Sequence, residues 1–297
     1  LPVGLIWFVG RRLFSPFVGL IAAAFAALNS FMAGESVSVL RDDLLTCLFL
    51  GLMAIPVYLG DQRWWRAIAF GVLGAALALT RVNGIFLLAV FVGIEAWRWR
   101  WKPLEIAIVF LIAIPPLVPH LLFNARVSDG DFFYSANVHT RYYLNRALVG
   151  EPGFPADEVA WQADPYAGEV VGTGAFLRHF SIFDLAGRVV RGYIIIFLYE
   201  FPHEILFRGS ELAMLFGLPG AWVLWQRRRR LWWPVLWTVL FLFPVALVAV
   251  IRLDRRLALP AVPIILWTWS AGLEWFFQAS RRRILSLKSR GRTSAPP

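Results

Sequence analysis

Six charged residues at the short polar breaks between the apolar runs of this chain could take part in chemistry. Three of these candidates are carboxylates and three are arginines. An arginine neutralises a phosphate through charge-assisted hydrogen bonds, whereas an ionised carboxylate acts as a general base or holds a divalent metal ion. Brought to one membrane surface, the two kinds of group suit a reaction on a lipid-linked anionic substrate. The candidates are Glu35, Asp42, Asp43, Arg81, Arg255 and Arg256.

A polar stretch over about residues 124–187, rich in Gly, Pro, Asp, Tyr and Asn, supplies the remaining candidates. Here Tyr142 and Tyr143 could stack on a sugar ring or pack the loop onto a membrane surface, and His139 lies just before them. The histidines are scattered, and the single cysteine, Cys47, lies in an apolar run. HExxH, GxxxxGK(S/T) and GxSxG motifs are absent, so zinc-protease, P-loop and serine-hydrolase chemistry has no basis in this sequence.

The composition indicates which elements must position these residues. Hydrophobic residues make up 59% of the 297 residues, charged residues make up 16%, and the mean hydropathy is +0.64. Several apolar runs approach the ~20 residues with which a helix crosses the hydrocarbon core of a bilayer. We therefore predict an all-α, polytopic transmembrane helical bundle. The pI of about 10.6 comes from basic clusters between apolar runs, so nucleic-acid binding is not expected.

The chain is organised around residues 67–97, an apolar run that is broken once, at residues 80–84. Each half holds about fourteen residues, too few to span a bilayer comfortably, and this predicts a helical hairpin whose tip stops short of the far surface. Arg81 would then lie below the headgroups or face a water-filled recess. An arginine there costs at least ~2.5 kcal/mol unless it snorkels or binds an anion. Two interpretations stay open, a phosphate site and a helix end that reaches the interface.

The other runs give a topology with one basic side. Of the 29 lysines and arginines, 17 fall in five clusters that this topology places on the cytoplasmic side. Those clusters are bordered, as in an aromatic belt, by Trp64, Trp65, Trp97, Trp99, Trp101, Trp225, Trp232 and Trp233. The chain is predicted to be one membrane domain (1–297) with spans at 1–10, 13–32, 44–60, 104–123, 212–225, 231–251 and 257–277, an external loop at about 124–187, an interfacial helix at about 188–207 and a cytoplasmic basic tail at about 280–297.

This order of features resembles the polytopic GT-C glycosyltransferases, and most closely glycosyltransferase family 39, with its bacterial relatives of protein O-mannosyltransferases and lipid A aminoarabinose transferases. Besides the hairpin and the long external loop, the resemblance rests on the segments LRDDLLTCLFLGL (40–52) and RLDRRLALPAVPIILWTWSAGL (252–273). The family's Leu-Thr-Arg/Lys hairpin tip is matched by Leu79, Thr80 and Arg81. Its Arg-Tyr-x-x-Pro-x-x-Pro motif is matched in part by Arg256, Pro260 and Pro263, with Leu257 in place of the tyrosine.

The resemblance implies a multi-pass enzyme of the plasma membrane, expected to be a bacterial inner membrane. It would transfer a sugar from a polyprenyl-phosphate donor to a lipid, glycan or protein acceptor on the external face. It implies that Asp42, or else Asp43, is a catalytic acid, with Glu35 a weaker candidate, and that Arg81 and Arg256 bind the carrier phosphate. The family's principal acidic pair would precede residue 1, so we expect an amino-terminally truncated chain without that pair.

Other interpretations of the same residues stay open. Asp42 and Asp43 begin a span, where carboxylates stabilise the positive end of the helix dipole. Arg255 and Arg256 could form an interfacial cluster with Asp254. A transporter or flippase for a lipid-linked glycan would share the outer arginines, but the sequence has one broken hairpin without a counterpart in its second half, which favours the enzyme. A structural membrane subunit would tolerate changes to all of these charges.

Overall fold

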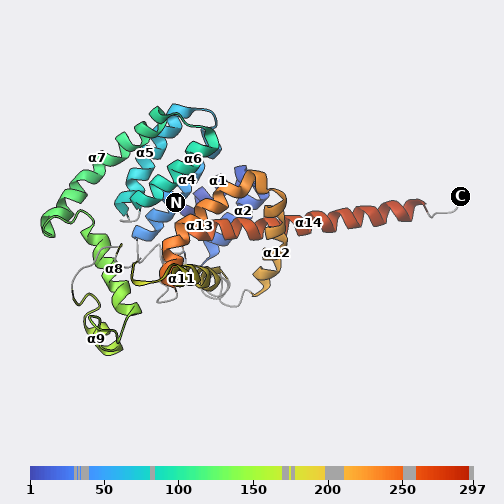
Figure 1. Cartoon of the computed structure of the whole chain (residues 1–297). Helices are drawn as coiled ribbons and strands as arrows, with labels where there is room; N and C mark the ends of the chain where they lie inside the picture. The colour runs from blue at the N-terminus through green and yellow to red at the C-terminus, as the bar shows by residue number, and fades with distance from the viewer. Residues whose placement is uncertain are drawn as a thin grey trace.

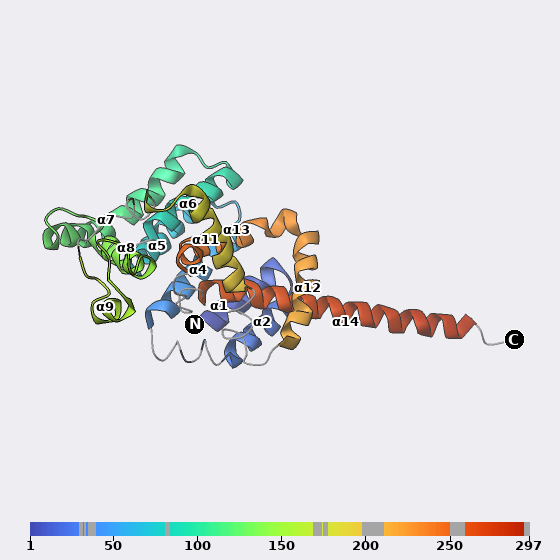
Figure 2. The ribbon, with the colours of Figure 1, turned by 60° about the horizontal axis from the view of Figure 1, so that its bottom comes forward.

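The computed structural model describes residues 1–29, 32, 34, 40–80, 84–168, 174, 178–197, 211–249 and 259–293, and only the backbone at 40–42, 211–215, 228–230, 248–249 and 286–293. Within these ranges the chain forms twelve α-helices and no strand, which confirms the all-α prediction. Most of the helices pack into one body, from which the carboxyl-terminal part of α14 (Val262–Thr293) projects (Figure 1 and Figure 2).

Four consecutive helices with short connections form one side of this body: α4 (Leu40–Tyr58), α5 (Arg63–Thr80), α6 (Gly84–Trp99) and α7 (Pro103–Val127). The predicted hairpin is α5 with α6. Gly84 lies against the backbone of Ala78, and Gly74 lies against the side chain of Leu88, which gives an antiparallel register. Glycine at these positions lets the two helices approach closely.

The neighbours of α5 fix where the hairpin tip lies. α4 is antiparallel to α5, with Gly51 beside Leu73. α7 is parallel to α5, because Arg63 pairs with Glu105 and Gly71 lies against Ile112. With this register, Thr80 is level with about residue 120, and the rest of α7 extends roughly 10 Å further. The hairpin thus ends short of its neighbour. We call the two ends of this layer the Arg63 end and the Asp43 end.

A second group of helices packs against α14. It consists of α14 with α1 (Pro2–Leu13), α2 (Pro16–Leu28) and α12 (Glu211–Gln226), which crosses α14 (Figure 1). Trp267 Nε1 donates a hydrogen bond to the carbonyl of Ile6 (3.0 Å), and Ser15 Oγ donates one to Glu274 (2.8 Å). The ring of Phe8 stacks on Tyr58 with centroids 3.9 Å apart. This stack fastens α1 to α4 and joins the two groups.

Two further helices complete the core, α13 (Arg228–Ala249) and α11 (Ile182–Ile194). α13 is antiparallel to α6, because Phe91 stacks on Trp237 (4.4 Å between centroids) and Trp97 meets Trp232 (5.6 Å). α11 lies across α13, with Tyr193 Oη donating to the carbonyl of Val239 (2.5 Å). α11 overlaps the helix predicted at about 188–207 but begins earlier, at Ile182. The second half of the predicted helix falls outside the described residues.

Several predicted boundaries differ from the observed ones. The described part of the external loop includes α8 (Tyr134–Ala147), α9 (Glu158–Ala163) and the start of α11, and the basic tail continues α14 as far as Thr293. In the described part of the run predicted as a span over 13–32, the longest helix is the 13-residue α2. Among the described helices, one is both long and apolar enough to cross a membrane, the 25-residue α7; the apolar segments of α2, α4 and α13 are shorter.

The tryptophans of the predicted aromatic belt differ in their exposure, and the belt itself stays a prediction. Trp64, Trp65, Trp97 and Trp225 are exposed, as a belt requires. Trp101 and Trp233, however, are 7% and 2% exposed and belong to the core, where Phe70, Trp101, Trp237 and Trp233 meet edge to face.

Candidate functional site

The helix ends that flank the predicted site lie together at the Asp43 end of the layer. α4 begins there, α5 ends there at Thr80, and α6 begins there at Gly84. The contact between Gly51 and Leu73 sets a register in which Asp43, half-buried in the first turns of α4, is level with the end of α5. α13 is antiparallel to α6, so it also ends on this side.

Four of the nine predicted site residues fall outside the part of the chain that the structure describes. This applies to Glu35, Arg81, Arg255 and Arg256, and the structure gives only the backbone of Asp42, which lies in α4. The roles predicted for these residues therefore stay predictions. The described site consists of Asp43, the helix ends around it and the loop helices α8 and α9.

Hydrogen bonds around Asn124 attach α8 to the end of α7. The buried Asn124 donates through Nδ2 to the carbonyl of Phe132 (3.1 Å) and accepts from Ser135 Oγ (2.9 Å). Ser128 Oγ donates to the carbonyl of Asn124 (2.6 Å) and accepts from the backbone N–H of Asp131 (3.1 Å). The turn between α7 and α8 is therefore a fixed elbow, and it places α8 beyond the Asp43 end.

Arg141 organises the loop beneath α8. Its side chain is 6% exposed, and it donates to the carbonyls of Ala167 (2.9 Å) and Gly153 (3.1 Å). Asn145, one turn later, donates to Pro165 and to Ala167 (2.9 and 3.0 Å). Because these backbone carbonyls need a buried donor, Arg141 has a structural role in folding the loop.

One face of α8 carries the three candidates from the loop. His139, Tyr142 and Tyr143 have the i, i+3, i+4 spacing of neighbours on a helix, and Arg146 continues that face. His139 is exposed. The ring of Tyr142 contacts three other rings with centroids 5.3–5.5 Å apart, those of Tyr143, Trp161 and Tyr166. These contacts pack Tyr142 within the loop, and both its sugar-stacking role and the packing of the loop onto a membrane surface stay predictions.

A buried charge cluster at the opposite, Arg63 end is not among the sequence-predicted sites. Glu95 is fully buried and accepts two hydrogen bonds from Arg98 (3.1 and 3.3 Å). Arg66 is 1% exposed and lies 4.2 Å over the ring of Trp99. Its Nε and Nη1 have no hydrogen-bond partner among the described residues. The signal in the sequence is Glu95 itself, a carboxylate three residues before an arginine near the end of an apolar run.

Two observations bear on the class of the site. Among the described residues, no group of three or more His, Cys, Asp or Glu side chains could hold a metal ion, so the expected divalent metal has no described ligand set. Comparisons of the chain with protein-family models, with curated proteins and with solved structures found no match. The functional argument therefore depends on the chain itself.

Proposed function

We propose that this chain is an integral-membrane glycosyltransferase of the GT-C type, which transfers a sugar from a polyprenyl-phosphate donor to an acceptor on the external face of the membrane. The observation that carries the proposal is the shared position of the helix ends. The ends of α4, α5, α6 and α13, which flank the predicted acids and arginines in the sequence, lie on one side, and the elbow adds α8 to that side.

The exposed surface of α7 supports a place in the membrane. Only 17% of its most apolar stretch is buried, and Leu104, Leu111 and Phe123 are 59%, 73% and 62% exposed. A buried core helix of a soluble protein would not present such a surface, and large exposed apolar patches mark membrane or partner contacts. In the same register, Arg63 and Lys102 stand at one end of this layer and the polar loop helices at the other, as a positive-inside topology requires.

The chemistry proposed for the Asp43 end needs few groups. The reaction breaks the bond between the sugar and the carrier phosphate, so negative charge grows on the phosphate as the sugar leaves. Arg81 and Arg256 would stabilise that charge. Asp42 would accept the proton of the attacking hydroxyl as general base. The recess of the hairpin tip relative to α7 supports an arginine at phosphate depth, because Arg81 is the residue that follows Thr80 in the chain.

The proposal is tested in membranes that carry the full-length protein, with radiolabelled sugars on polyprenyl phosphate as donors. We expect Asp42→Asn to lower turnover and Arg81→Ala to raise the KM for the donor. Asp129→Asn and Arg126→Ala change exposed residues of the α7–α8 elbow and serve as controls. Wild-type turnover in Asp42→Asn together with an unchanged KM in Arg81→Ala would exclude the site.

A further inference from the structure

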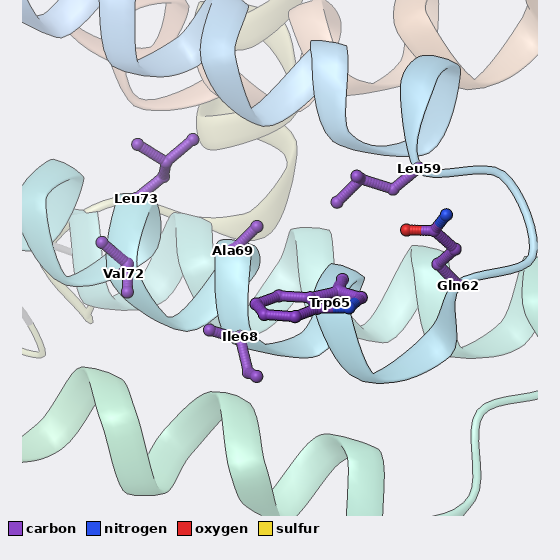
Figure 3. A pocket seen from close by; sticks show the side chains of 7 residues that line it. All are labelled: Leu59, Gln62, Trp65, Ile68, Ala69, Val72 and Leu73. Carbon is purple, nitrogen blue, oxygen red and sulfur yellow. The ribbon is translucent and has the colours of Figure 1, made fainter.

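A groove on the outer face of α5 continues from apolar to polar surface. Its apolar part has a volume of about 410 Å³ and is lined by Leu59, Gln62, Trp65, Ile68, Ala69, Val72 and Leu73 (Figure 3). Its polar part, about 430 Å³, is lined by Asp61, Gln62, Arg63, Trp64 and Trp65. Gln62 and Trp65 belong to both parts, so the two form one groove that runs from the Arg63 end along α5.

The polar part presents one charge of each sign. The side chain of Arg63 is 49% exposed, and its contact with Glu105 is a loose one of 3.9 Å. Asp61 is exposed two residues earlier, and its carbonyl accepts from the backbone N–H of Arg63 (2.8 Å). Arg63 and Asp61 therefore both line the polar part, which continues into the apolar part at Gln62 and Trp65.

We propose that this groove binds a phospholipid whose headgroup carries both a phosphate and a primary ammonium, that is, phosphatidylethanolamine. Arg63 contacts the phosphate, Asp61 accepts hydrogen bonds from the ammonium, and one acyl chain lies over Ala69 and Val72. The exposed Trp64 and Trp65 place the polar part at headgroup depth, where amphipathic rings collect. The inference rests on the membrane placement within the proposed function and is independent of sugar transfer.

The charge pair distinguishes this lipid from its neighbours in a bilayer. Phosphatidylcholine keeps the phosphate, but its quaternary ammonium has no N–H group to donate to Asp61. Phosphatidylglycerol keeps the phosphate but has no cation, so its charge is repelled by Asp61. A charge-assisted hydrogen bond at a partly exposed site changes affinity by about twofold to fivefold, and we expect a preference of that size.

The test uses the detergent-purified full chain and native mass spectrometry with an equimolar mixture of the three phospholipids, all with the same acyl chains. We expect the phosphatidylethanolamine adduct to exceed the other two by about twofold to fivefold. Asp61→Asn should reduce it to the phosphatidylcholine level, and Arg63→Gln should weaken binding of all three. Ala69→Phe should fill the apolar part and remove the adducts. The control variants are Arg126→Gln and Asp129→Asn, which should behave as wild type.

Three results would overturn the inference. These are equal retention of the three lipids, charge variants that behave like the controls, and a second copy of the chain in the groove, seen as a dimer that Ala69→Phe dissociates. Release of the protein from membranes by alkaline carbonate would refute the membrane placement, and with it both proposals. Sugar transfer is not part of the readout, so a negative lipid result leaves the proposed enzyme standing.

Discussion

The buried charge cluster at the Arg63 end gives the sharpest prediction on stability. Glu95 is fully buried, bonds Arg98 and is the carboxylate that most strongly stabilises the charge of Arg66. Glu95→Gln keeps the shape of the side chain but removes its charge. Two guanidinium groups would then share a desolvated site without this counter-ion. We expect the folded state to lose stability for this reason.

The size of this stability loss depends on whether each arginine side chain can turn toward water. Removing one partner of a buried ion pair costs about 3–5 kcal/mol. The side chain of Arg98 is 22% exposed and can turn toward water, whereas Arg66 is 1% exposed and cannot. The lower value, about 3 kcal/mol, is therefore expected, and in a chain of this length it lowers Tm by roughly 6 °C. Replacing both charges, in Arg66→Met with Glu95→Met, should restore stability to within about 1 kcal/mol.

The assay is thermal unfolding in detergent, followed by tryptophan fluorescence, with Glu151→Gln as the control because Glu151 is exposed in the external loop. If Glu95→Gln melts within about 1 °C of the wild type, the reasoning is refuted. If the double variant melts below Glu95→Gln, the cluster does not act as an ion pair. The double variant keeps the test decisive should Glu95→Gln fail to fold, because recovery of folding would itself demonstrate the coupling.

Two further predictions concern other contacts of the fold. Gly84→Ala would place a methyl group against the backbone of Ala78 and so overpack the hairpin. We expect this variant to lose about 1–3 kcal/mol of unfolding free energy. Gly93→Ala, in the same helix, places its methyl group in open space and should lose none. Burial raises the pKa of Tyr193 from 10 to about 12 in the folded state. The folded state therefore gains stability from the neutral phenol, fully below pH 10, and this contribution is lost as the pH rises from about 10 to about 12. The wild type should therefore lose more stability over that range than Tyr193→Phe, as measured by chemical unfolding at each pH.

The parts of the fold that the sequence predicts are those set by local pattern. The all-α class, the hairpin and the helical runs follow from the lengths of the apolar runs and from the polar breaks at residues 61–66 and 80–84. The helix bounds were less predictable, because Arg63 and Trp99 extend α5 and α6 beyond their apolar runs. Such residues are expected at an interface, whereas in the structure Arg66 and Trp99 pack against each other.

The positions that could not be predicted depend on contacts between distant segments. Trp233 is adjacent to a run of arginines and is expected at an interface, but its ring is covered by Arg98 at 4.5 Å and by Trp237 at 5.4 Å. Arg141 is likewise buried by carbonyls 12 and 26 residues away in the sequence. Hydrophobicity and spacing do not predict that a charged side chain will be covered in this way, because the groups that cover it come from segments that are distant in the sequence.

The hairpin is held differently at its two ends, and this separates its stability from its proposed activity. At the Arg63 end, α5 and α6 are joined by the guanidinium of Arg66, which lies over the ring of Trp99. At the tip they are joined by the close approach of Gly84 to α5. Glu95 lies eleven residues beyond Gly84, roughly 16 Å along the helix. A methyl group at Gly84 shifts the segment that precedes it, which includes Arg81, whereas loss of the Glu95 charge acts far from the tip.

We therefore expect opposite rankings for the two variants. Per folded molecule, Gly84→Ala should lower sugar transfer more than Glu95→Gln does, although Glu95→Gln should lower Tm at least as much. The comparison uses initial rates divided by the folded fraction, with Gly93→Ala as the reference. If Glu95→Gln lowers the normalised rate more than Gly84→Ala does, the reaction takes place at the Arg63 end, and the assignment of the site to the hairpin tip is wrong.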